Sequence, residues 1–179
     1  MLLYSLHVKQ LSVFFICALF LALNSRTQTS VQFVHCAGDT ALGSVDVWLD
    51  TIRITNDLDF RHSTNYRLVD FSSVGSVLSV TPSTSIDTTL AYYRDTVHLE
   101  ENSKHQIFLH GSVSAGYNPA IPFNIDIHSN ARVAADEADN SDVTFFNGIT
   151  DMGSLQLFET SVINNELISG LSHSQHSPY

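Results

Sequence analysis

Histidine is the residue type with the widest chemical use in this sequence, and eight of the nine histidines follow residue 30. None stands in a His-Glu-x-x-His or a tight His-x-His pattern, the spacings that place two ligands on one metal. His105 and His110 are five positions apart, on opposite faces of one strand, which argues against a shared metal. His35 ends an apolar stretch beside a loop that carries Asp39. We predict that His35 orients this loop through a hydrogen bond to a carboxylate or backbone carbonyl. A ligand role is the alternative.

A catalytic nucleophile is equally hard to assemble from the serines and cysteines. The Gly-x-Ser-x-Gly elbow of serine hydrolases does not occur, and Gly170-Leu-Ser-His differs from it. Cys36 follows His35 directly, but neighbours in a strand point to opposite faces and cannot form a Cys/His pair. We predict that the protein is not an enzyme. A hydrolase is the alternative, and it would require a cleft with convergent histidine and carboxylate groups of shifted pKa.

Carboxylates gather in the stretch 136–142, where the oxygen donors are Asp136, Glu137, Asp139, Asn140 and Asp142. Calcium prefers such oxygen ligands. The match to an EF-hand loop fails, because the glycine at its sixth position and the distal glutamate are missing. We therefore favour a solvated acidic linker and no cofactor. The alternative is a calcium-stiffened scaffold in which the four carboxylates bind the metal.

Aromatic side chains could stack on a sugar ring, and Trp48, Tyr92 and Tyr93 are the candidates for this role. In a sandwich rich in apolar residues, such side chains more often pack. His35, Asp39 and Trp48 are the predicted ligand-contact residues.

Residues 1–30 have the pattern of an export signal. Lys9 precedes a 13-residue apolar run, Leu11–Leu23, and a polar stretch follows it. The run is shorter than the ~20 residues that a membrane-spanning helix needs. We predict a secretory signal peptide cleaved before Val31, a mature chain without a membrane span, and a location outside the cytoplasm, secreted or at the cell surface. Cys36 is then the one cysteine left, which excludes an internal disulfide.

Composition and charge narrow the choice of partners. Hydrophobic residues make up 44% of the 179 and charged residues only 15%, which suits β-sheet better than helix. Loss of Lys9 and Arg26 with the signal leaves 6 of 8 basic residues against all 18 acidic ones, a formal charge of −12. An acidic surface without a basic cluster argues against nucleic acid and anionic membranes as partners. Cations, neutral sugars and other proteins remain.

Short runs of alternating apolar and polar residues recur after residue 30, the pattern of half-buried strands. In the run 45–50, Val45, Val47 and Leu49 are expected to face the core, and the even-numbered residues, Trp48 included, the solvent. The other runs are 31–35, 66–71, 75–80, 88–99, 105–110 and 123–127. This spacing predicts an all-β fold, an immunoglobulin-like antiparallel β-sandwich over residues 31–130.

An internal repeat covers the end of the chain. The segments Val31–Asp39 and Gly43–Trp48 recur as Val143–Asp151 and Gly153–Phe158, with two residues fewer between them. We therefore predict an acidic linker over 131–142 and a truncated second repeat over 143–179. Two strands cannot form a core of their own, so we expect this tail to lie against the first sandwich by edge pairing, to pair with another chain or to stay mobile. We also expect the parent protein to continue past Tyr179.

These segments resemble the family of secreted prokaryotic repeats known as domain of unknown function 4397. Its members open with a strand that runs into a His-Ala-Ser-Pro-Asp-Ala-like loop and continue with a Val-Asp-Val-Tyr-like strand, which Val34–Asp39 and Val45–Trp48 resemble. Gly116–Phe123 is similar to the closing segment of some members. The chain departs from the pattern in lacking the loop prolines. The resemblance covers about residues 31–172, implies a β-sandwich in exported multi-repeat proteins, and supplies no catalytic residues.

The sequence as a whole favours an exported, non-catalytic binding or spacer module. Such a module would contact protein or glycan through the loops at one end of the sandwich.

Overall fold

The structure is a computed structural model that describes residues 27–71, 75–161 and 165–177. These residues form an all-β fold, as predicted, with one 3-10 helix, η1 (Thr40–Leu42), and no α-helix. No helix among them is long and apolar enough to cross a membrane. The strands are β1 (Thr27–His35), β2 (Ser44–Leu49), β3 (Ile52–Asp59), β4 (Arg67–Phe71), β5 (Ser76–Pro82), β6 (Tyr93–Val97), β7 (Lys104–His110), β8 (Asn124–Ser129), β9 (Ser154–Glu159) and β10 (Asn165–Ser172).

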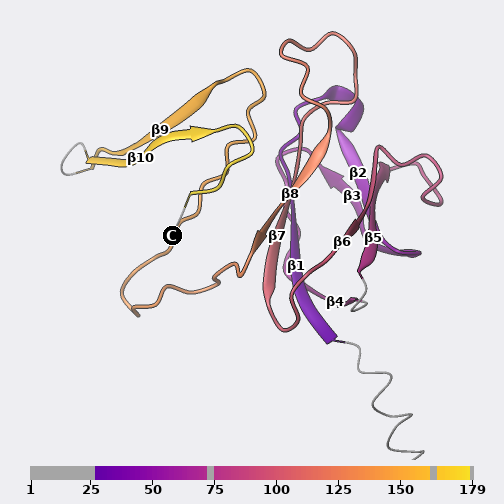
Figure 1. The fold of residues 1–179 in the computed structure, drawn as a ribbon, viewed down its shortest axis with the longest axis horizontal. Helices are drawn as coiled ribbons and strands as arrows, with labels where there is room; N and C mark the ends of the chain where they lie inside the picture. The colour runs from indigo at the N-terminus through magenta and orange to yellow at the C-terminus, as the bar shows by residue number, and fades with distance from the viewer. Residues whose placement is uncertain (1–26, 72–74, 162–164, 178–179) are drawn as a thin grey trace, which may run out of the picture.

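Strands β1 to β8 form two four-stranded sheets, with the orders β4-β1-β7-β8 and β3-β2-β5-β6 (Figure 1). Every pairing within them is antiparallel except that of β1 with β7, which is parallel. In an immunoglobulin domain the first strand lies beside the second, whereas here β1 lies between β4 and β7. The predicted sandwich is present, and its strand order differs from the immunoglobulin order.

The core lies between the inward faces of the two sheets. On β2, Val45, Val47 and Leu49 are buried as predicted, and they join Phe33 of β1 and Leu109 of β7 in one hydrophobic cluster. Because side chains alternate along each strand, residues 106, 108 and 110 of β7 point to the outer face of the sheet, away from this cluster.

Trp48 does not face solvent, contrary to the prediction. Its indole Nε1 donates a hydrogen bond of 3.0 Å to the hydroxyl of Thr81, and the guanidinium of Arg53 lies 4.4 Å from the centre of its ring. Arg53 also forms an ion pair of 3.2 Å with the fully buried Asp46. Arg53 belongs to the neighbouring strand β3 and lies directly opposite Trp48 in the sheet. Its side chain therefore covers the outer face of β2.

Two strand boundaries also differ from the sequence prediction. β1 begins at Thr27, and the pairs from Thr27 to Ser30 make up most of its ladder with β4. Cleavage before Val31 would remove four of its five pairs, so a signal peptide compatible with the fold would end earlier. The expected strand over 88–99 is confined to β6, five residues long, because the segment before it forms turns. Residues 1–26 of the predicted signal lie outside the described residues.

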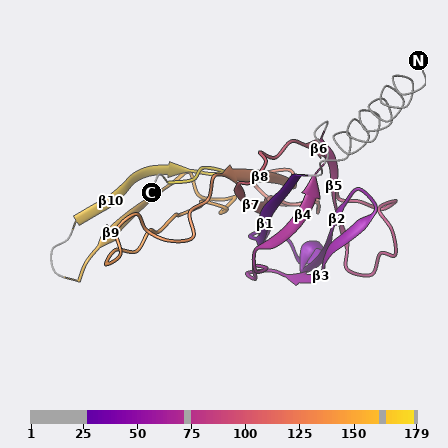
Figure 2. The ribbon, with the colours of Figure 1, turned by 90° about the horizontal axis from the view of Figure 1, so that it is seen from below.

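A hairpin of β9 and β10 forms a separate two-stranded sheet. Figures 1 and 2 show it extending away from the sandwich, to which residues 130–150 connect it. The tail therefore does not lengthen either sheet of the sandwich by edge pairing, which was one of the three arrangements expected.

The hairpin repeats the hairpin of β2 and β3 pair by pair. β9 follows β2 by 110 positions (44 to 154) and β10 follows β3 by 113 (52 to 165). With these offsets, both breaks in register recur at matching places. The pairs Val45–Leu58, Val47–Thr55 and Trp48–Arg53 become Leu155–Leu171, Leu157–Ile168 and Phe158–Glu166. We call residues 27–130 the first unit and residues 143–177 the second unit.

The hydrogen bonds that tie β1 to the end of the hairpin recur as well. His35 exchanges backbone bonds with Arg61 and His62, and Asn147 exchanges them with Ser174 and Gln175. The isolated bridge Val34–Ser63 likewise recurs as Phe146–His176. The described part of the second unit therefore has the same backbone pairing as the segment from the end of β1 to β3.

Candidate functional site

Asp39 holds together two loops at one end of the sandwich. It is 2% exposed and caps η1 by accepting a bond from the amide of Ala41 at 2.9 Å. It also accepts bonds from the amides of Val113 and Ser114, at 2.8 and 2.7 Å, and from the Ser114 hydroxyl at 2.7 Å. Burial alone would raise the pKa of Asp39, but these donors outweigh it and lower the pKa to about 2. The carboxylate is ionised at neutral pH and fixes the loops 36–43 and 111–117.

His35 stabilises the same loop from inside the core. It is fully buried, and its Nε2 lies 2.6 Å from the carbonyl oxygen of Leu42 while its Nδ1 accepts a bond from the amide of Ala37. These partners require a proton on Nε2. Burial lowers the pKa of His35, against smaller opposing effects of the Leu42 bond and the charge of Asp59. The imidazole is therefore neutral and contacts a backbone carbonyl of the loop, as the sequence predicted.

The second loop depends on a glycine. Gly111 has a φ of 87°, and a Cβ there would lie 2.3 Å from the carbonyl oxygen of Pro122. This close approach lets Ser112 bond to Ile121 and Phe123 through its backbone. The loop is thereby closed at its base.

The three predicted ligand-contact residues do not share one surface. His35 and Asp39 lie together but are buried, and Trp48 is covered by Arg53. The exposed side chains at the loop end include Val113 and Tyr117, at 40% and 37% exposure. Any contact with a partner there would use those side chains, which the buried pair positions.

The predicted calcium ligands are spread along the linker. Arg132 forms ion pairs with Asp136 at 2.5 Å and Asp142 at 2.8 Å, and the amide of Asn140 donates to Glu137. In the described part of the chain, no three histidine, cysteine, aspartate or glutamate side chains are close enough to hold a metal ion. Two of the four candidate carboxylates thus form ion pairs with one guanidinium.

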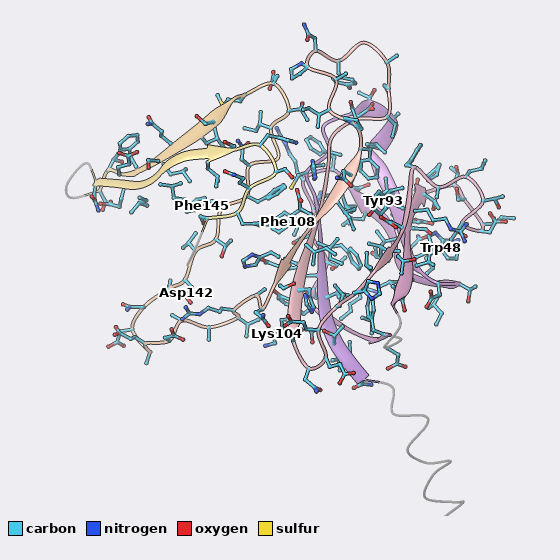
Figure 3. All side chains as sticks on the ribbon, in the orientation of Figure 1. Trp48, Tyr93, Lys104, Phe108, Asp142 and Phe145 are labelled. Atoms are coloured by element: carbon cyan, nitrogen blue, oxygen red, sulfur yellow. The ribbon has the colours of Figure 1, made fainter. Side chains whose placement is uncertain are left out.

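A cluster that sequence analysis missed lies where the second unit meets the outer face of β7 and β8. We call it the junction cluster; its members are Phe108, His110, Asp126 and His128 of the first unit and Phe146, His173 and His176 of the second. Phe108 stacks on Phe146 with ring centres 4.3 Å apart. The ring centres of His110 and His173 are 5.0 Å apart, and those of His128 and His176 are 4.8 Å apart. Figure 3 shows Phe108 on the face of the sandwich that is turned toward the segment carrying Phe145, while Trp48 and Tyr93 lie on the far side.

Close backbone approach accompanies this ring packing. A Cβ at Gly148 would lie 2.9 Å from the Cβ of Cys36, so the second unit touches the first at the end of β1. Burial raises the pKa of the Cys36 thiol to about 11. This half-buried cysteine is therefore neutral at neutral pH and not a thiolate nucleophile.

The charges of the cluster centre on one carboxylate. Asp126 lies 2.9 Å from Nε2 of His110 and accepts a hydrogen bond from the hydroxyl of Ser174. Burial lowers the pKa of His110, partly offset by the charge of Asp126, and burial also lowers the pKa values of His128 and His176. These rings are neutral at neutral pH.

Convergent histidines and a carboxylate were the features required of a hydrolase, and the junction cluster contains them. The hydrogen bonds among these groups do not match those of a serine hydrolase. Ser174 donates to the carboxylate of Asp126, whereas an activated serine needs an imidazole nitrogen as its base. The arrangement is suited to joining the two units.

Sequence spacing gives little indication of the junction cluster, since its members come from four separate segments. The available indication was the alternation that places Phe108 with His110, and Asp126 with His128, on outer faces, together with His173 and His176 in the tail. Comparison with known proteins adds nothing further: no family model matches the chain, and no curated protein matches it significantly.

Proposed function

We propose that this protein is an exported, non-catalytic binding and spacer module built from β-sandwich repeats, at the cell surface or secreted. It would belong with the repeats known as domain of unknown function 4397. It would contact protein or glycan through the loops 36–43 and 111–117.

The observation that carries the proposal is the repetition of the backbone hydrogen bonds in the second unit. The backbone amide of Thr64 donates a hydrogen bond to the carbonyl of Phe33, and the Thr64 hydroxyl accepts one from the amide of Phe33. Ser177 makes the same two bonds with Phe145. Tandem copies of one unit are typical of proteins that extend a chain or multiply a binding surface.

The buried polar residues support a scaffold role. Asp39 and His35 hold the loops in place and leave exposed the side chains of residues such as Tyr117. Loops fixed by a rigid sandwich are a common place for recognition. The acidic balance of the chain, 18 acidic against 8 basic residues, favours neutral or basic partners.

The test is an array of glycans and extracellular proteins probed with the full mature chain. We expect a ligand whose binding is lost in the Tyr117→Ala variant and retained in Ile86→Ala, an exposed residue outside these loops. A hydrolytic activity toward ester, peptide or glycosidic substrates that disappears in His110→Gln would refute the proposal and favour the hydrolase.

A further inference from the structure

The second unit presents a strand edge that the first unit keeps paired. In the first unit, β2 lies between β3 and β5. In the second unit, β9 pairs with β10 on one edge, and no strand among the described residues pairs with its other edge. Figure 2 shows this hairpin pointing away from the sandwich.

Along this edge, two residues of β9 are apolar, like the core residues of β2 to which they correspond. Val45 and Val47 are fully buried, and their counterparts Leu155 and Leu157 are half-buried. Leu167, the counterpart of the partly buried Ile54, is 52% exposed. An apolar, strand-edged surface of this kind is a template for an added strand.

The first unit shows what pairs with the equivalent edge. β5 runs antiparallel to β2 and pairs Leu49 with Leu78 and Val47 with Val80. Leu78 and Val80 are both fully buried against the core. β5 carries no charged residue, so the acidic chain does not repel a strand of this type.

We propose that the open edge of β9 is a binding site for one extended polypeptide segment of the β5 type, added antiparallel, uncharged, and with apolar side chains at alternate positions. In the register of β2 with β5, its residues at the positions of Val80 and Pro82 would lie opposite Leu157 and Leu155, and its residue at the position of Leu78 opposite Glu159. Backbone hydrogen bonds to β9 supply affinity and the alternating side chains supply selectivity. This surface is separate from the loops of the proposed function, so each proposal can fail without the other.

The test uses the isotope-labelled full chain and a synthetic peptide with the sequence of β5, Ser76–Pro82. We expect saturable shifts of the β9 amide signals and slower hydrogen exchange there. A control peptide with Leu78→Asn and Val80→Asn keeps the length and neutrality and should not bind.

Matched variants of the protein locate the site. Leu157→Asp should weaken peptide binding by more than about tenfold, because pairing would bury its charge. Gln156→Asp, on the other face of the same strand, should leave binding unchanged. Fluorescence of Trp48, the one tryptophan of the chain, reports that the first unit stays folded in both variants.

Three results would overturn the proposal. One is equal binding of both peptides, which would show unselective adhesion. Another is the lack of any shift at the highest soluble peptide concentration. The third is protection of the β9 amides that rises with protein concentration without peptide, which would assign the edge to a second copy of the chain.

Discussion

The first and second units share one pattern of backbone hydrogen bonds but differ in burial. Val31 and Ala37 are each 1% exposed, whereas their counterparts Val143 and Ile149 are 57% and 45% exposed. The bulged hairpin forms in both units because its two strands are neighbours in sequence, and the bridge beside it recurs as well. Burial depends on strands β4 to β8, whose counterparts are not among the described residues of the second unit.

The same difference explains why residues 143–147 are not a strand. Their counterparts belong to β1, which gains its ladder from β4 on one edge and β7 on the other. Among the described residues of the second unit, this segment pairs with no strand and forms an isolated bridge between Phe146 and His176. A strand is thus a property of its neighbours as well as of its own sequence.

The largest expected effect comes from placing a charge at matched positions of the two units. Val47→Asp buries a carboxylate without a partner in the core and should destabilise the first unit by several kcal/mol. Leu157→Asp, at the counterpart position, should change stability little, because that side chain is half-exposed. Thermal unfolding followed by far-ultraviolet circular dichroism, to which the strands of both units contribute, measures both. Equal losses would show that the second unit has a core of its own.

Alternation along the chain was enough to predict the sandwich and the inward face of β2. It assigned Trp48 wrongly, because a sequence does not show that Arg53 of the next strand covers the outer face. The parallel pairing of β1 with β7 joins residues more than 70 positions apart, such as Ser30 and Lys104. No local pattern specifies such a contact.

For the candidate sites too, contacts between residues near in sequence could be predicted and contacts between distant segments could not. The role of His35 beside its loop could be predicted, because Leu42 is seven positions away. The contacts of Asp39 with Val113 and Ser114, and the junction cluster, could not, since they depend on the packing of distant segments. The similarity of the two segments was visible in the sequence, but their matching bulges emerged only from the register of the strands.

The second prediction compares the loop aspartates of the two units. Asp39→Asn removes the charge that several hydrogen-bond donors stabilise. It should lower the free energy of unfolding of the first unit by about 1–3 kcal/mol. Asp151→Asn, at the exposed counterpart position, should cost almost nothing. The pKa of Asp39 is lowered to about 2, below its ordinary value of 3.8, so its contribution is complete above pH 3.8 and is lost as the pH falls toward 2. Denaturant unfolding at neutral and acidic pH measures both variants. An Asp39→Asn variant with the stability of the original protein would contradict the assigned hydrogen bonds.

The third prediction concerns the contact between the units. Phe146→Ala removes the ring stacked on Phe108, a pair worth about 0.5–1.5 kcal/mol. It should release the second unit from the sandwich and leave the melting temperature of the first unit nearly unchanged. Small-angle scattering should show a larger radius of gyration. Phe158→Ala, an exposed aromatic of the same unit, is the control and should leave the radius unchanged. An equal increase in both variants would mean that the junction cluster does not hold the units together.

The smallest expected effect is a pH dependence of that contact. Several titratable and polar groups face one another at the junction: His110 from β7, Asp126 and His128 from β8, and His173, Ser174 and His176 from the second unit. Burial lowers the pKa values of His110, His128 and His176 below the ordinary 6.5, with Asp126 opposing it at His110 and His176.

The docked arrangement therefore binds fewer protons than the released one. Its stability is complete above pH 6.5 and declines as the pH falls below 6.5 toward the lowered pKa values. We expect the radius of gyration to increase between neutral pH and about pH 5. Neither ring nitrogen of His176 has a hydrogen-bond partner among the described residues, so a proton there gains no acceptor. A double variant, His128→Gln with His176→Gln, should show a weaker pH dependence, because two of the titrating rings are gone. An unchanged pH profile in that variant would assign the effect to groups outside the junction cluster.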